Sequence, residues 1–238
     1  MNVNVHMSNR SEITSISKCK IIDVIWFASR HPEAARFDGG VVAWYVCRGP
    51  MLSPHPLFDV GHYVSENPDW ERSASTPLGH YVLVGAARDA TPHVLFDPAW
   101  YAAQVPAMAP EMLFCHYLTE GFAAGLWPHP GFDPDFYWSQ SPELRANRPN
   151  PLLHFVETGW AEGLSPNRFF DLPWYAARHP ELKAAGINPY IHFLTCGVSQ
   201  GERPHPAMPA EPLDRFLRIV AEGKDPPATM LSWSGSSA

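Results

Sequence analysis

Histidine has the most suggestive spacing in this sequence, because it recurs at one position of a repeated pattern. The recurring residues, each five positions before a glycine, are His80, His116, His154 and His192. Imidazole is the commonest metal ligand, so this ladder is a candidate zinc site. However, equivalent helices in a stacked array lie roughly 8–10 Å apart, whereas zinc ligands sit about 2.0–2.1 Å from the ion. We therefore expect no metal, and instead packed histidines that hydrogen bond to a neighbouring loop carbonyl.

A G-x-S-x-G sequence at residues 197–201 matches the nucleophile elbow of α/β-hydrolases, with Ser199 as the candidate nucleophile. That motif needs a strand before the serine and a helix after it, and neither is predicted here. The same slot reads GFAAG from Gly121 and GWAEG from Gly159. The glycines therefore belong to the repeat, and we interpret Ser199 as incidental.

Repeated aspartates could supply paired carboxylates for glycoside chemistry. Asp97 and Asp133 each precede a proline and a short apolar run, which is typical of a helix N-cap. Capping already explains these residues and their counterparts Asp59 and Asp171. The sequence therefore predicts no catalytic residues and no cofactor.

Aromatic residues offer a third kind of chemistry, because planar faces can receive sugar rings. Trp100, Phe136 and Trp174 each stand immediately before a repeated tyrosine, which makes them candidates for a ligand-binding face. Burial in the core is the commoner use of a large aromatic on a short helix, and both interpretations stay open. Three further histidines, His55, His129 and His205, lie in Pro-His-Pro links and are expected to be solvated in stiff linkers.

The elements that position these residues repeat about every 37 residues. Five copies of Asp followed four residues later by an aromatic begin at Asp23, Asp59, Asp97, Asp133 and Asp171, and we call these repeats one to five. Each copy reaches a glycine, at Gly49, Gly85, Gly121, Gly159 and Gly197. Such periods indicate an array whose units bury a shared core by stacking on their neighbours.

Each repeat reads as short helices separated by proline and glycine. The first helix follows the aspartate, and a second opens at a proline such as Pro142 or Pro180. A third opens at Asn150-Pro151 or Asn188-Pro189, and we expect it to end at the repeat glycine as a left-handed residue. The link G-x-x-x-G-x-x-P follows, with Asp89 replacing its second glycine in repeat two, where the turn is expected to differ. The predicted fold class is therefore all-α, with two or three short helices in each unit.

Composition and chain ends set further limits. The 238 residues carry a net charge of -7, without the clustered basic footprint that nucleic acid requires. The four cysteines have no zinc or disulfide spacing and are interpreted as free thiols. Because no signal peptide or membrane-spanning run is apparent, we expect a cytoplasmic protein. The expected organisation is a disordered tail over 1–20, the repeat domain over 21–208, a capping helix over 209–224 and a second disordered tail over 225–238.

The unit as a whole, written L-F-D-x-x-x-Y, N-P-L-x-H-F/Y and G-x-x-E-G-x-x-P, resembles a short tandem repeat of bacterial surface-polysaccharide proteins. The likeness covers residues 21–208 and is closest in 95–97, 150–163 and 188–204. In that family the repeat often precedes glycosyltransferase domains, including those of rhamnan-synthesis F-like proteins. The resemblance implies a context of polysaccharide biosynthesis and carries no catalytic residues over to this chain.

The sequence thus favours a non-catalytic interaction module, with a glycosyltransferase, a polysaccharide-assembly component or a glycan as its partner. Two alternatives stay open, namely an accessory region or fragment of a glycosyltransferase and a glycan-binding protein that uses the aromatic stripe.

Overall fold

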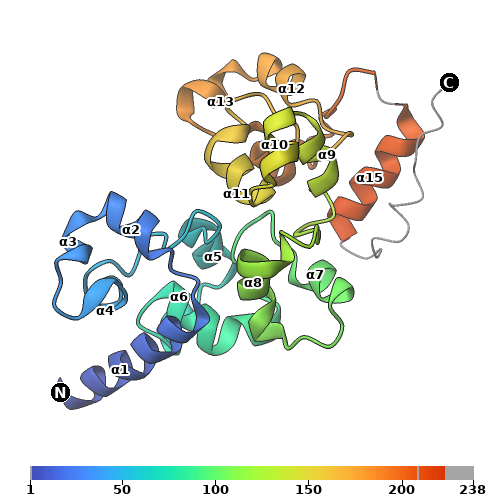
Figure 1. Cartoon of the computed structure of the whole chain (residues 1–238). Helices are drawn as coiled ribbons and strands as arrows, with labels where there is room; N and C mark the ends of the chain where they lie inside the picture. The colour runs from blue at the N-terminus through green and yellow to red at the C-terminus, as the bar shows by residue number, and fades with distance from the viewer. Residues whose placement is uncertain (1, 208, 223–238) are drawn as a thin grey trace. The chain divides into compact units, whose positions relative to one another are not determined.

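The computed structural model describes residues 2–207 and 209–222, and within them the chain forms helices and connecting turns without a β-strand. The predicted all-α repeat array is confirmed. The chain divides into two compact units, one of Met1–Pro98 with Ala107–Leu118 and the other of Ala99–Pro106 with Thr119–Ala238. Short helices follow one another closely in each unit (Figure 1).

Most elements are only one or two turns long. The first unit holds α1 (Asn2–Cys19), α2 (Val24–Arg30), α3 (Pro32–Ala35), α4 (Gly40–Arg48), α5 (Val60–Glu66), η1 (Trp70–Arg72), α6 (Pro77–His80), η2 (Tyr81–Gly85), η3 (Ala86–Arg88), η4 (Pro110–Met112) and α8 (Leu113–His116). The chain passes between the units within α7 (Pro98–Gln104) and η5 (Tyr117–Gly121). The second unit continues with α9 (Pro134–Ser139), α10 (Pro142–Asn147), α11 (Pro151–His154), η6 (Phe155–Gly159), α12 (Leu172–Arg178), α13 (Pro180–Ala185), α14 (Pro189–His192), η7 (Phe193–Gly197) and α15 (Ala210–Glu222).

In repeats two to five the third helix changes type partway along its length, whereas α4 of repeat one is α-helical throughout and ends before Gly49. An α-helical turn ends at the repeat histidine, and a π-helical turn then runs to the repeat glycine, as in α11 followed by η6 and α14 followed by η7. The glycines are thus the last residues of right-handed π turns: Gly85, for example, has φ -63°. The expectation that the repeat glycines, such as Gly159 and Gly197, are left-handed is therefore wrong.

The second glycine of the link takes that conformation instead. Gly125, Gly163 and Gly201 have φ between 70° and 83°, which glycine adopts without a steric penalty. Asp89, which occupies the equivalent position in repeat two, is also left-handed, with φ 56°. The turn expected to differ in that repeat therefore keeps the same backbone conformation.

A backbone hydrogen bond closes several repeats upon themselves. The N–H of Asp133 donates to the carbonyl of Pro166 at 3.0 Å, and the N–H of Asp171 donates to the carbonyl of Pro204 at 2.9 Å. The same bond joins Asp59 to Pro92. Each such hydrogen bond therefore closes a loop of 34 residues and holds the end of the link beside the start of the first helix.

The core of each repeat is a cluster of aromatic rings. In repeat five the rings of Phe170, Tyr175 and Phe193 have centroids 5.1 to 5.6 Å apart, within the favourable range for aromatic pairs. Repeat four reproduces the cluster with Phe132, Tyr137 and Phe155. The recurring aromatics therefore act first as the core that holds each closed loop together.

The N-terminal segment corrects the expected disordered tail over residues 1–20, because α1 occupies Asn2–Cys19 and packs against α4 and α6. Ile16 and Glu12 are each 1% exposed. The Glu12 carboxylate accepts hydrogen bonds from the Thr76 hydroxyl at 2.6 Å and the Ser75 N–H at 2.8 Å. Polar composition concealed this helix because its docking depends on one buried carboxylate rather than on an apolar stripe.

At the other end, α15 matches the expected capping helix. Phe216 and Ile219 on this helix are buried, and Phe216 stacks on Phe169 at 4.9 Å. The second tail expected over 225–238 lies outside the described residues.

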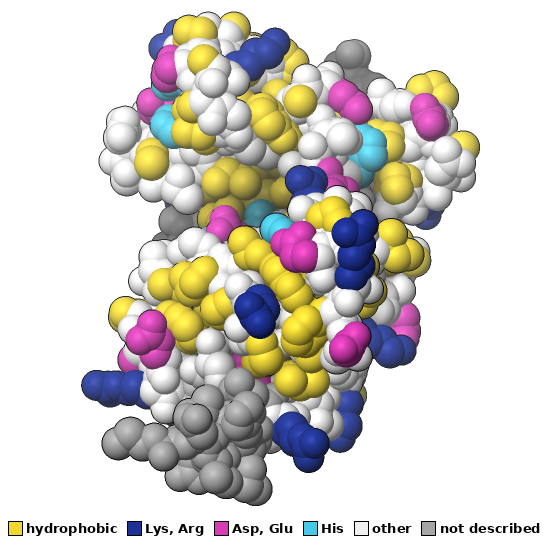
Figure 2. Space-filling model, turned by 90° about the vertical axis from the view of Figure 1, so that its left-hand side faces the viewer, with side chains coloured by type: hydrophobic (Ala, Val, Ile, Leu, Met, Phe, Trp, Pro, Cys, Tyr) yellow, Lys and Arg dark blue, Asp and Glu magenta, His cyan; other side chains and the backbone are white. Residues whose placement is uncertain are grey.

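Figure 2 shows one face of the molecule, on which basic, acidic and apolar side chains are interspersed without an extended basic footprint.

No helix in the described part of the chain is long and apolar enough to cross a membrane.

Candidate ligand-binding site

The repeated aspartates cap the first helices of their repeats. Asp133 Oδ1 accepts from the Phe136 N–H at 2.9 Å, and Asp171 Oδ1 accepts from the Trp174 N–H at 3.0 Å. Asp59 accepts in the same way from His62, and α7 begins directly after Asp97. These carboxylates are held at separate helix starts by backbone donors, which is a structural role.

The histidine ladder bonds to tyrosine hydroxyls, so the expected loop-carbonyl partner is wrong. The Nδ1 atoms of His80, His154 and His192 lie 2.6, 2.7 and 3.0 Å from the hydroxyls of Tyr63, Tyr137 and Tyr175 respectively. His116 ends α8 at the same repeat position. Each pair lies within one repeat, and among the described residues no group of three or more His, Cys, Asp or Glu side chains is placed to hold a metal ion.

The link histidines are structural and largely buried, which corrects the expectation that they are solvated. The Nδ1 atoms of His55 and His129 accept from the backbone N–H two residues later, at 2.9 and 3.0 Å. His205 accepts in the same way while being partly exposed. His93 and Asn167 hold the same position with the same bond, although neither lies in a Pro-His-Pro sequence. Alignment by distance from the repeat glycine would have found both.

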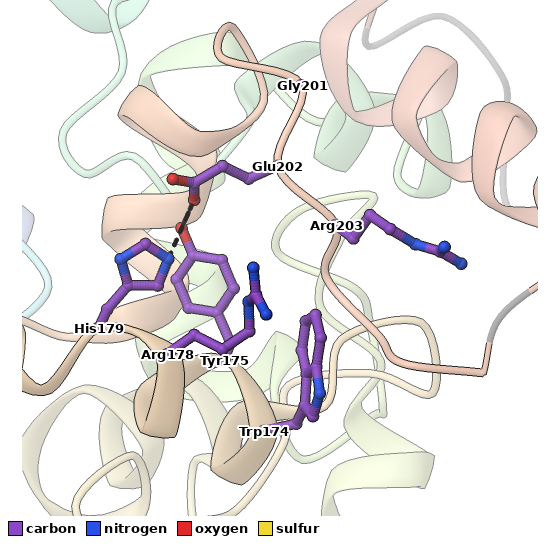
Figure 3. Close-up of a pocket in the computed structure, with 7 residues that line it drawn as sticks. All are labelled: Trp174, Tyr175, Arg178, His179, Gly201, Glu202 and Arg203. Atoms are coloured by element: carbon purple, nitrogen blue, oxygen red, sulfur yellow. Dashed lines mark hydrogen bonds and ion pairs between the residues drawn. The ribbon is translucent and has the colours of Figure 1, made fainter.

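The three side chains of the proposed aromatic stripe differ in how deeply they are buried. Trp100 is 2% exposed and belongs to the core, which corrects its candidacy for a ligand face. Phe136 and Trp174 are each partly exposed. Of the three, Trp174 lines a pocket (Figure 3).

This pocket lies in repeat five and has a volume of about 300 Å³. It is lined by Trp174, Tyr175, Arg178, His179, Gly201, Glu202 and Arg203. The first four come from α12 and its C-cap, and the last three come from the returning link. The pocket is therefore the space between the first helix of the repeat and the link that closes the repeat.

Repeats three and four differ from repeat five in the contact between the first helix and the link. In repeat four, the Gln140 side chain donates to the Ser165 carbonyl at 2.7 Å and accepts from the Ser165 N–H at 2.9 Å. Gln104 makes the same two bonds to Trp127 in repeat three. Arg178 replaces the glutamine in repeat five, and a guanidinium has no acceptor atom with which to reproduce this bridge. Its Cζ instead lies 4.9 Å from the centroid of the Trp174 ring.

A polar network forms one side of the pocket. The Tyr175 hydroxyl donates to Glu202 Oε2, and His179 Nε2 lies 3.4 Å from the same oxygen. Glu202 occupies the position of Leu126 and Leu164 in the sister repeats, so it is a polar exception at an otherwise apolar site. Burial, reinforced by the hydrogen bond to Glu202, raises the pKa of Tyr175 well above its usual value. Tyr175 is therefore a neutral hydrogen-bond donor and not a nucleophile.

The chemistry that this arrangement supports is binding. Figure 3 shows Glu202, Tyr175 and His179 joined on one side, Trp174 and Arg203 on the other, and the Arg178 guanidinium between them. Ser199 lies outside the pocket, and its hydroxyl donates to the Cys196 carbonyl at 2.8 Å. Trp174 was found from the sequence, whereas Arg178, Glu202 and Arg203 were missed. The sequence signal for these three is that they replace a glutamine, a leucine and an uncharged residue (Trp127 or Ser165) of repeats three and four.

Comparisons with protein-family models, with curated proteins and with solved structures find no match to this chain.

Proposed function

We propose that this protein is a non-catalytic interaction module of bacterial surface-polysaccharide assembly, and that the pocket of repeat five binds glycan. The single observation that carries the glycan-binding part is the pocket beside Trp174, in a repeat that has lost the glutamine bridge of its sisters. The context of polysaccharide assembly comes from the resemblance of the repeat sequence. A glycosyltransferase or another assembly component is the protein partner that this resemblance suggests.

The lining combines groups that are able to bind a carbohydrate. A partly exposed indole provides a flat apolar face, and Arg178, Glu202 and His179 place hydrogen-bonding groups around it. Ligand sites commonly combine a mainly apolar wall with a few placed polar groups. The pocket lies at the lower end of the usual range of roughly 300–1,000 Å³. It therefore suits one residue of a glycan better than a long segment.

Glycan binding can be tested by titration calorimetry of the purified chain with a panel of neutral and acidic oligosaccharides. We expect binding to at least one member, and Trp174→Ala should weaken it by roughly 10-fold or more because stacking on an aromatic face is lost. Trp26→Ala is the matched control. Trp26 has the same repeat position and also lies under an arginine, Arg30, at 4.6 Å, but Phe27 and Leu52 stand in repeat one where Tyr175 and Glu202 stand in repeat five.

Equal loss of binding in the two tryptophan variants would show that this pocket is not the site. Turnover of a nucleotide-sugar donor by the purified chain alone would contradict the non-catalytic assignment.

A further inference from the structure

We propose that two copies of this chain associate head to tail, with the link of repeat five in one copy packed on the first helix of repeat one in the other. The inference is independent of glycan binding, because it concerns the two ends of the array. It depends on how consecutive repeats contact each other within one chain, and on which of these contact positions are open at the ends.

Within the chain, the link of one repeat contacts the start of the next repeat's first helix. The Leu172 N–H donates to Ser165 Oγ at 3.1 Å, which joins repeat five to the link of repeat four. The Val60 N–H donates to Ser53 Oγ at 3.5 Å, which joins repeat two to the link of repeat one. Each junction thus brings together two surfaces. We call the link around the position of Ser165 the exit face, and the two residues after the repeat aspartate the start face.

Repeat one has an open start face. Val24, the residue after its aspartate, is 49% exposed, whereas Val60 and Leu172 at the same position are 4% and 2% exposed. Pro98 and Pro134, at that position in the other two repeats, are also buried. The helix α1 precedes repeat one but leaves Val24 accessible. The start face of repeat one therefore lacks the cover that a preceding repeat supplies elsewhere in the array.

The next position makes this open face apolar. Ile25 is 85% exposed. The other repeats also expose this position, where they carry Gly61, Ala99, Asp135 and Pro173. Terminal units of a repeat array normally present a polar outer face, because an exposed apolar one promotes association. An exposed isoleucine beside an exposed valine is therefore the pattern expected of a face that a partner covers.

Repeat five has the complementary open exit face. Arg203, which occupies the position of Ser165, is exposed. The other four repeats keep this position partly buried, with Ser53, Thr91, Trp127 and Ser165. The link histidine shows the same difference, because His205 is partly exposed while its counterparts in repeats one to four are buried. This exposure remains with α15 in place, since Phe216 of that helix packs on Phe169 at the beginning of repeat five.

A second copy is the partner that fits, because each end of the array lacks what the other end offers. In the proposed contact, α2 of the second copy follows the link of repeat five as α12 follows the link of repeat four. The two faces differ, so the contact is heterologous and each copy can join another copy at both of its ends. The association therefore produces chains or rings of copies and not a two-fold symmetric dimer.

Sedimentation velocity of the purified full chain, over roughly 1 µM to 1 mM, measures the association. We expect the average mass to rise with concentration above that of one copy. Ile25→Asp should weaken association by roughly 10-fold or more, because it places a charge in an apolar contact. Leu83→Asp is the matched control and should leave association unchanged. Leu83 is 43% exposed in repeat two, at neither a start face nor an exit face.

A second variant tests the head-to-tail order. Within the chain, the residue at the position of Arg203 contacts the N–H that follows the repeat aspartate. Arg203→Glu should therefore bring a carboxylate beside Asp23 of the second copy and block association, because like charges repel. A mixture of Ile25→Asp and Arg203→Glu should form a heterodimer, since the first variant keeps its exit face and the second keeps its start face. Thermal unfolding checks that each variant is folded.

A mass that stays at one copy over the whole concentration range overturns the inference. Equal effects of Ile25→Asp and Leu83→Asp overturn the assignment of the start face. An Arg203→Glu variant that associates like the parent, or a mixture of the two variants that stays monomeric, overturns the head-to-tail order. None of these outcomes bears on glycan binding, which calorimetry tests separately.

Discussion

The repeated tyrosine, histidine and glycine act together at the scale of single residues. A Cβ added to Gly159 would lie 1.9 Å from the Tyr137 hydroxyl and 3.1 Å from His154 Nδ1, so the glycine is required by the hydrogen-bonded pair beside it. Repeat one keeps its glycine for another contact, since a Cβ added to Gly49 would lie 2.7 Å from the Trp44 ring. Phe27 and Trp44 replace both polar partners there, and their rings meet edge to face at 5.9 Å. The two positions have changed together, as expected for residues in contact.

Gly159→Ala should therefore destabilise the protein by about 2 kcal/mol or more, although alanine in a helix is ordinarily favoured over glycine by about 1 kcal/mol. In a Tyr137→Phe background, which removes the colliding oxygen, the same substitution should cost markedly less. Urea unfolding of the four proteins of this double-mutant cycle measures the coupling. Gly61→Ala is the control, because an added Cβ there meets only an Asp59 oxygen at 3.3 Å. If the unfolding free-energy changes of Gly159→Ala and Tyr137→Phe simply added in the double mutant, the proposed contact would be contradicted.

At the scale of elements, the link is held to the first helix by one side chain. Gln140 joins α9 to the link through two hydrogen bonds to Ser165, while Arg178 at the same position of α12 stacks on Trp174. The two repeats thus differ in how this position contacts its surroundings. The glutamine amide can both donate and accept, whereas a guanidinium can only donate.

Gln140→Ala should lower the free energy of unfolding by about 2 kcal/mol, since two hydrogen bonds of roughly 1 kcal/mol each are lost. Arg178→Ala is the matched change in repeat five and should cost less than about 1 kcal/mol, as expected for an exposed cation–π contact. Chemical denaturation followed by far-UV circular dichroism compares them. A larger loss for Arg178→Ala than for Gln140→Ala would contradict our inference that the glutamine makes the stronger contact between helix and link.

At the scale of the whole molecule, the buried link histidines make stability depend on pH. His93 is 2% exposed, and burial lowers its pKa from 6.5 to about 4; burial does the same to His55. The unfolded chain takes up protons below pH 6.5 that the folded chain does not bind until about pH 4. Stability should therefore be full above pH 6.5 and fall as the pH decreases towards 4, by up to about 3 kcal/mol for each histidine.

His93→Asn tests this dependence with a substitution that the array itself uses, since Asn167 makes the equivalent bond to a backbone N–H at 2.8 Å. The variant should keep its stability at pH 7 and lose less of it between pH 6.5 and 4 than the parent protein. Urea unfolding across that range provides the measurement. His205→Asn, at a partly exposed link position, tests whether burial is the cause. An unchanged pH slope in His93→Asn would contradict the role of His93.

The sequence predicted the elements well, because they depend on local chemistry. Aspartate and asparagine caps, prolines at first helical positions and the recurring aromatics specify short helices without knowledge of the distant chain. The α1 helix was missed, because its docking depends on Glu12 reaching Ser75 and Thr76, more than 60 residues away. The left-handed glycine lies four residues later than expected, because a further turn follows the π turn and the Leu164 N–H donates to the Gly159 carbonyl at 2.9 Å.

In the candidate site, too, some features follow from local sequence and others depend on contacts between distant segments. The repeat, the all-helical fold and the candidacy of Trp174 follow from the sequence alone, because they depend on spacing and residue type. The folded structure was needed to show that Trp100 is core, that the histidines bond to tyrosines, and that Arg178, Glu202 and Arg203 line one pocket. The physical reason is that burial and convergence depend on which segments the closed repeat brings together. Residues 174–179 and 201–203 become neighbours only when the link folds back onto α12.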